Sequence, residues 1–248
     1  MMFHHRIRFK LAKLPAASVL AILLSAISAA GWGDGLTIAP IEQPYVHSLE
    51  REIELHSVWQ HRLDDQPHQI GTTLSAAVAN RHNFLLELSA SGIDLPESRP
   101  QATSLEIEAK WQLTEQGQYN ADWGITLELE REVTLNRWEA GTTLLWQREF
   151  SDWIATVNGN LYYEWGSNYS NEIETSLGAQ LRYRLSSLLE PTLALHLSQD
   201  TGAIGPGLWL HQRLAPGRRL NWQLSLLQGF KTTTPEQTAL IAVEYEFY

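Results

Sequence analysis

The sequence contains no cysteine, which removes two ways of stabilising or anchoring a chain. Without cysteine there are no disulfide bonds, and there is no thiol to carry a lipid anchor. The free energy of folding must therefore come from backbone pairing and side-chain packing.

Basic residues are scarce after the first 30 positions. The chain has 18 Lys and Arg, of which Arg6, Arg8, Lys10 and Lys13 precede residue 31, so 14 remain against 28 Asp and Glu. The formal net charge of this remaining part is −14. Because phosphate backbones bind cationic surfaces, we expect no nucleic-acid partner.

Long apolar runs are also missing from most of the chain. The longest, Leu14 to Ile27, follows a basic start and precedes small residues at 28–30. This layout is typical of a secretory signal peptide, and the run is short for a spanning helix. We predict a cleaved signal peptide over residues 1–30 and an irregular periplasmic lead-in over 31–50. Any membrane crossing after that must use strands.

What the sequence does contain, from Arg51 onward, is alternation of apolar and polar residues. Segments of about ten residues alternate and are separated by turn residues, a pattern typical of a membrane β-barrel. We predict an all-β, antiparallel up-and-down barrel of about 12 strands over residues 51–248. The expected strands are 51–62, 69–79, 83–91, 104–113, 122–130, 137–147, 153–165, 172–185, 192–198, 205–214, 220–228 and 239–248.

The clearest hairpin joins residues 104–113 to residues 122–130. Both segments carry apolar residues at odd positions and mostly polar ones at even positions. If the hairpin is symmetric about Gly117, Trp111 faces Trp123 and Glu106 faces Glu128.

Aromatic residues gather near the two ends of the expected strands. Such girdles mark the two interfaces of a bilayer, and a soluble sandwich has no reason to form them. The predicted interface aromatics are Trp59, Trp138 and Trp165 at one end, and Trp111, Trp123, Trp146, Trp153, Tyr183, Trp222, Tyr245 and Phe247 at the other. The main alternative is a secreted β-sandwich or lipocalin-like barrel, in which the apolar face points inward.

The final segment, 239–248, alternates up to the aromatic Phe247 and ends one residue later at Tyr248. With the leader and the alternating strands, it resembles the porin-like outer-membrane β-barrel proteins of Gram-negative bacteria over residues 51–248. The resemblance implies a location in the bacterial outer membrane. It also implies outer-membrane lipid as a partner and barrel assembly machinery that reads the C-terminal strand.

The inward parity of the expected strands is rich in charge. The predicted lumen residues are Glu52, Glu54, His56, Glu106, Glu108, Lys110, Glu128, Glu130, Glu174, Arg182 and Arg184. These groups either fill the lumen as a salt-bridged plug or line a wet pore, in which the acidic excess favours cations. Passage of small solutes or cations through a narrow acidic channel is the leading hypothesis, and a structural or binding barrel with a plugged lumen is an alternative. Closure of the barrel should bring Glu244 and Glu246 beside Glu52 and Glu54, with Arg51 and Arg62 as the nearest counter-charges.

A second alternative is a lipid-modifying enzyme. His196 and Ser198 form an inward His-x-Ser pair that resembles the pair of outer-membrane lipid A deacylases, and the resemblance implies a base and a nucleophile. A supporting Glu is missing, because none occurs between Glu190 and Glu236. A hydrogen-bonded structural pair is therefore the more favoured interpretation.

Other chemistry finds little support in the sequence. His47, His56, His61 and His68 lie near the first expected strand, but proximity along a strand does not make ligands converge. The chain has no phosphate-binding loop, dinucleotide fingerprint, zincin motif or nucleophile elbow. We therefore expect no cofactor and no metal centre.

Overall fold

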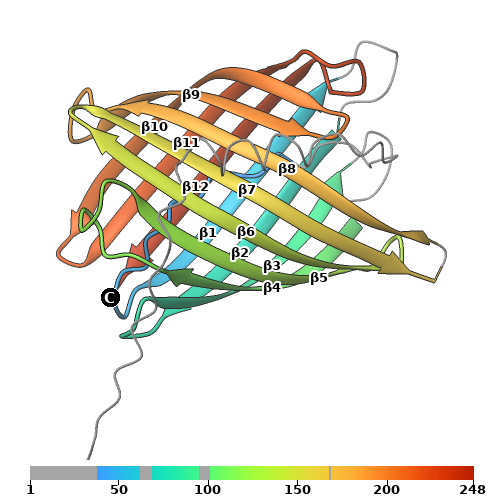
Figure 1. Ribbon diagram of the computed structural model, residues 1–248, viewed down its shortest axis with the longest axis horizontal. Coiled ribbons are helices and arrows are strands. Elements are labelled where there is room, and N and C mark those ends of the chain that lie inside the picture. Colours follow the sequence, from blue (N-terminus) through green and yellow to red (C-terminus); the bar gives the residue numbers. More distant parts are fainter. Residues whose placement is uncertain (1–37, 62–68, 95–100, 168) are drawn as a thin grey trace, which may run out of the picture.

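Twelve antiparallel strands form one closed barrel (Figure 1). The computed structural model describes residues 38–61, 69–94, 101–167 and 169–248. Each strand pairs with its neighbours in the sequence, and the first pairs with the last. The strands are β1 (Arg51–His61), β2 (Gln69–Ala79), β3 (Phe84–Asp94), β4 (Gln101–Gln112), β5 (Asp122–Glu132), β6 (Arg137–Phe150), β7 (Trp153–Gly166), β8 (Tyr169–Tyr183), β9 (Leu189–Ser198), β10 (Gly202–Ala215), β11 (Arg218–Gly229) and β12 (Gln237–Phe247). The predicted fold class is confirmed, and so is the predicted number of strands.

The barrel has two different ends. The end where β1 begins and β12 finishes, here called the terminus end, lies to the left in Figure 1, where the C-terminus is marked. At the opposite end, here called the loop end, β6, β7 and β8 project beyond their neighbours on the right of Figure 1. These three strands have 14, 14 and 15 residues, against 10 to 12 in most of the others.

The apolar face of the wall points outward. Leu105 and Leu127 are 59% and 49% exposed, whereas the neighbouring inward residues Thr126 and Gln147 are at most 1% exposed. A soluble barrel would bury its leucines and expose its polar residues, so this inside-out arrangement excludes the lipocalin-like alternative. Within the described residues, no helix is long and apolar enough to cross a membrane.

The β4–β5 hairpin differs from the expected register by two residues. Glu108, not Glu106, pairs with Glu128, and Trp111 pairs with Ile125 rather than Trp123. The carboxylate of Asp122 accepts a hydrogen bond from the Gly117 amide at 3.1 Å within the turn. The strand pairing begins at Gln112 and Gly124, so the turn is not symmetric about Gly117. A shift of two residues preserves the side to which every side chain points, so the facing prediction survives the error in register.

Residues 38–46 pack inside the barrel, and the exposed residues 47–49 turn at the terminus end and lead to β1. The sequence predicted an irregular periplasmic lead-in over 31–50, and its described part instead packs against the inner wall. Ile38 and Ile41 join a buried cluster with residues of β9 to β12, which are Ala194, Ala203, Leu227, Leu240 and Ala242. Val46 joins a second cluster with Ala77, Ala79 and Leu85 near the terminus end. The segment therefore crosses the lumen, and its apolar side chains are buried there because the inner wall offers two apolar patches.

Candidate functional site: the barrel lumen

Carboxylate side chains line the inner wall on β1, β3 to β7 and β12. Carboxylates point inward from neighbouring strands, and several face each other directly in the ladder: Glu52 and Glu246, Glu54 and Glu244, Glu108 and Glu128, Glu106 and Glu130. Like charges on adjacent strands repel unless a cation or a shared proton lies between them. These facing pairs therefore gather carboxyl groups along one side of the lumen.

Three of these carboxylates come especially close. One oxygen each of Glu106, Glu108 and Glu128 lies within 4.8 Å of the others. Oxygen donors at this spacing suit a hard cation, although acidic side chains also gather without one. The sequence placed all three on the inward parity but did not predict their convergence, because that depends on the β4–β5 register.

Lys110 places a positive charge beside these carboxyl groups. Its ammonium group lies 2.5 Å from a carboxylate oxygen of Glu42, in the segment that crosses the lumen. The sequence predicted Lys110 as a lumen residue, but it gave no partner, because Glu42 lies in a stretch without periodicity. The ion pair therefore joins the lumenal segment to the wall.

The segment is also held by hydrogen bonds to inward polar side chains. Asn158 of β7 makes two, accepting the Glu42 amide at 2.7 Å and donating to the Glu42 carbonyl at 2.9 Å. The Tyr45 hydroxyl donates to Asp122 at 2.7 Å and accepts from Gln147 at 2.9 Å. These side chains satisfy the backbone and the phenol of an otherwise irregular segment.

Two inward glycines make room for the segment. A Cβ at Gly124 would lie 3.0 Å from Pro44, and a Cβ at Gly178 would lie 3.2 Å from Ile41. Glycine in a strand often marks a place where another stretch of backbone approaches closely. The wall is thus shaped for the segment as well as bonded to it.

The wall from β8 to β12 carries a different, mixed-charge group near the terminus end. Arg182 is 3% exposed, and its guanidinium lies 4.5 Å from the centre of the Trp209 ring. Glu190 lies 3.6 Å from Arg182 and 3.7 Å from His211. The sequence predicted Arg182 but missed Trp209 and Glu190, although both fall on the inward parity of their strands.

This group continues to the seam between β12 and β1. Asn221 links His211 to Glu246 by hydrogen bonds of 3.0 and 2.5 Å, and Arg219 lies 3.0 Å from Glu246. The acidic seam was expected to be relieved by Arg51 or Arg62. Arg51 instead lies on the outward parity, Arg62 lies outside the described residues, and Arg219 supplies the charge from the neighbouring strand.

The remaining predicted lumen residues differ in position. His56 contacts Glu54 at 3.1 Å, and the side chains of Glu52, Glu130 and Glu174 are half-buried on the inner wall. Arg184 lies beyond the end of β8, where it pairs with Glu149 at 2.7 Å and is exposed. It belongs to the rim of the terminus end rather than to the lumen.

His196 and Ser198 do not form a catalytic pair in this structure. His196 is 8% exposed on the inner wall, whereas the Ser198 hydroxyl bonds to the Thr201 hydroxyl at 2.6 Å. Within the described residues no hydrogen bond joins His196 to Ser198, so nothing prepares the hydroxyl for attack. Among the other histidines, His61 stacks on Trp59, and His68 lies outside the described residues.

The predicted interface aromatics lie on the outer wall. Pairs stack at both ends, as Tyr245 does on Phe247 at the terminus end and Trp138 does on Trp165 at the loop end. Ring centres in these pairs are 5.5 and 6.4 Å apart.

Several solved structures share this architecture. The KdgM porin, solved in complex with disordered oligogalacturonate, has 10% sequence identity and a TM-score of 0.52, with 79% of this chain and 98% of that chain covered. The translocator domain of the autotransporter NalP from Neisseria meningitidis has 13% identity and a TM-score of 0.52, with 94% of each chain covered. The chain has the fold of bacterial outer-membrane β-barrels.

The NanC porin shares the same fold, with 9% identity, a TM-score of 0.52 and coverage of 79% of this chain and 99% of that chain. At these identities the likeness concerns the fold alone. No family model and no curated protein sequence matches the chain. The predicted outer-membrane location agrees with the location of these barrels, and the subfamily is not resolved.

Proposed function

We propose that this outer-membrane barrel is a narrow channel for small cations, whose lumen is obstructed by its own residues 38–46. The observation that carries the proposal is the run of facing carboxylates along β4, β5, β1 and β12. Rings and walls of carboxylates favour cations over anions in pores. The porin neighbours agree with a channel at the level of fold.

The three converging carboxylates of Glu106, Glu108 and Glu128 would form a binding site for a cation that passes through the lumen. Their oxygens lie within 4.8 Å of one another, and the Lys110 ammonium forms its ion pair with Glu42. A hydrated or partly dehydrated cation would relieve their mutual repulsion. Conduction needs such a site to be weak enough to release the ion, which flexible carboxylates provide.

The experiment is a planar-bilayer recording of the full mature barrel and of a variant that lacks residues 38–46. We expect low conductance from the unaltered protein. The deletion should raise the conductance severalfold, and its reversal potential in a potassium chloride gradient should lie on the cation-selective side. The matched control is the same deletion with Glu106, Glu108 and Glu128 changed to Gln, which should conduct with reduced cation preference.

A second candidate is a closed barrel with a structural or binding role. The observation in its favour is the number of specific contacts that hold the segment, including both bonds of Asn158 and the Lys110 ion pair. A folded deletion variant that passes no current would contradict the channel proposal and favour this second role. Folding is checked by heat-dependent mobility on a gel.

A further inference from the structure

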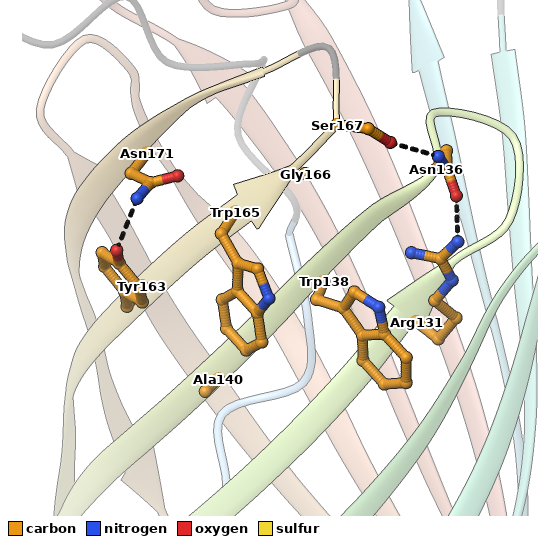
Figure 2. A pocket seen from close by; sticks show the side chains of 9 residues that line it. All are labelled: Arg131, Asn136, Trp138, Ala140, Tyr163, Trp165, Gly166, Ser167 and Asn171. Atoms are coloured by element: carbon orange, nitrogen blue, oxygen red, sulfur yellow. Dashed lines mark hydrogen bonds between the residues drawn. The ribbon is translucent and has the colours of Figure 1, made fainter.

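A groove on the outer wall at the loop end is separate from the lumen. It lies on the projecting ends of β6 and β7 and has a volume of about 590 Å³ (Figure 2). The residues that line it are Arg131, Asn136, Trp138, Ala140, Tyr163, Trp165, Gly166, Ser167 and Asn171. Because its aromatic side chains belong to the outward parity, the groove faces the surroundings of the barrel and not its interior.

The floor of the groove is a row of aromatic rings. Trp138 and Trp165 stack with ring centres 6.4 Å apart and planes 11° apart, and Tyr163 follows at 5.6 Å from Trp165. Figure 2 shows the two indoles side by side with their flat faces along the wall. Such surfaces sit well at a membrane interface, where one side of the ring contacts apolar groups and the other contacts polar ones.

A positive charge stands at one end of this row. The guanidinium of Arg131 lies 5.0 Å from the centre of the Trp138 ring and donates a hydrogen bond to the Asn136 side chain. Within the part of the chain that the structure describes, no carboxylate forms an ion pair with Arg131. Because Arg131 is oriented by an aromatic ring and a neutral amide, some of its guanidinium N–H groups stay available for an anion. The planar guanidinium can donate two parallel hydrogen bonds to a phosphate.

Neutral polar groups complete the rim. Asn136 donates to the Ser167 hydroxyl at 2.5 Å, and Asn171 donates to the Tyr163 hydroxyl at 2.8 Å (Figure 2). Amides and hydroxyls around flat aromatic faces suit a sugar ring, which offers an apolar C–H face and a hydroxyl edge. A glycerol headgroup has no ring to place on the paired indoles.

We propose that this groove binds the phosphorylated sugar headgroup of a glycolipid in the outer leaflet. Arg131 binds the phosphate, the Trp138 and Trp165 rings carry the sugar, and Asn136, Ser167 and Asn171 reach its hydroxyls. Basic pockets on membrane proteins bind anionic headgroups in the same way. The site fits its position, because the projecting strands place it at the end of the barrel opposite the C-terminus.

The test measures lipid binding to the full barrel in detergent micelles by native mass spectrometry. The probes are lipid A with its phosphates, the same acylated disaccharide without phosphates, and phosphatidylglycerol. We expect retention of lipid A by the unaltered protein, with at least about tenfold weaker binding of the other two probes. Arg131→Gln should weaken lipid A binding about tenfold, and Trp138→Ala should weaken it by a similar factor.

The matched control is Arg148→Gln, since Arg148 is an exposed arginine on the outward parity of β6 at the terminus end. It should leave lipid A binding within about twofold of the unaltered protein. The proposal is overturned if Arg131→Gln folds normally and binds lipid A as before. It is also overturned if phosphatidylglycerol binds as tightly as lipid A, because the groove would then select a phosphate without its sugar.

Discussion

At the scale of single residues, Tyr248 shows how the chain end is joined to the lumen. It follows the outward-facing Phe247, and its hydroxyl turns toward the seam. There it accepts a hydrogen bond from Arg219 at 3.0 Å and donates one to Glu50 at 2.9 Å. The position one residue beyond the last outward aromatic therefore has a physical role, which is to connect the C-terminus with the end of the lumenal segment.

Glu50 is the residue at this junction that should respond to pH. Burial, followed by the nearby carboxylates of Glu246 and Glu52, raises its pKa to about 8, and the Tyr248 hydrogen bond partly offsets the rise. A carboxyl whose pKa is higher in the folded than in the unfolded state binds its proton more tightly when folded. Its contribution to stability is therefore lost as pH rises from about 4.5 through about 8.

We predict that Glu50→Gln reduces this loss. Between pH 5 and pH 9 the free energy of unfolding of the unaltered barrel should fall by at least about 1 kcal/mol more than that of the variant. Urea unfolding in lipid vesicles, followed by tryptophan fluorescence, measures both slopes. Equal slopes would show that Glu50 keeps an ordinary pKa in the folded barrel.

Whether a single residue could be placed from the sequence depended on its odd or even position along a strand. Inward parity predicted the carboxylates of β4 and β5 as well as Arg182, because alternation assigns a side to every strand residue. Parity also places Trp209 inward, since its neighbours Leu208 and Leu210 point outward, but an aromatic residue on a polar face does not by itself indicate a partner such as Arg182. Arg184 was misplaced because parity says nothing about where a strand ends.

At the scale of elements, residues 38–50 are the part that sequence reasoning could not place. Strands were found by their period of two, and the segment has none. Its partners lie far along the chain, as when Glu42 bonds Asn158, 116 residues away. Register had a similar limit, because the β4–β5 pairing is fixed by the Asp122 contact to the turn rather than by any alternation.

The fit of this segment to the wall predicts that substitutions at two inward glycines differ in their cost to stability. Gly124 touches Pro44, whereas a Cβ at Gly71 would have open space within 4 Å. Gly124→Val should therefore lower the free energy of unfolding by about 1–3 kcal/mol relative to Gly71→Val, since both variants gain the same strand propensity. The comparison uses urea unfolding in vesicles, and equal stabilities would contradict the close packing of the segment.

At the scale of the whole molecule, the sequence was sufficient for the architecture. An apolar outward face, two aromatic girdles and the absence of long apolar runs after residue 30 leave a strand-built membrane barrel as the consistent fold. The sequence did not predict that the lumen is occupied, because strand alternation describes the barrel wall and not the residues inside it. The signal peptide predicted over residues 1–30 lies outside the described residues and stays a prediction.

The lumenal segment packs within the barrel, and we propose that it controls passage through the lumen. Because the chain has no cysteine, Ile41→Cys with Gly178→Cys introduces one possible disulfide, at a place where the added Cβ of residue 178 lies 3.2 Å from the Ile41 side chain.

The decisive measurement is the single-channel conductance of this double variant, oxidised and then reduced in the same bilayer. We predict that the disulfide forms in the folded barrel and abolishes the low conductance of the unaltered protein, and that reduction restores this low, cation-selective conductance. Failure of the two cysteines to cross-link, or the same conductance before and after reduction, would contradict the account.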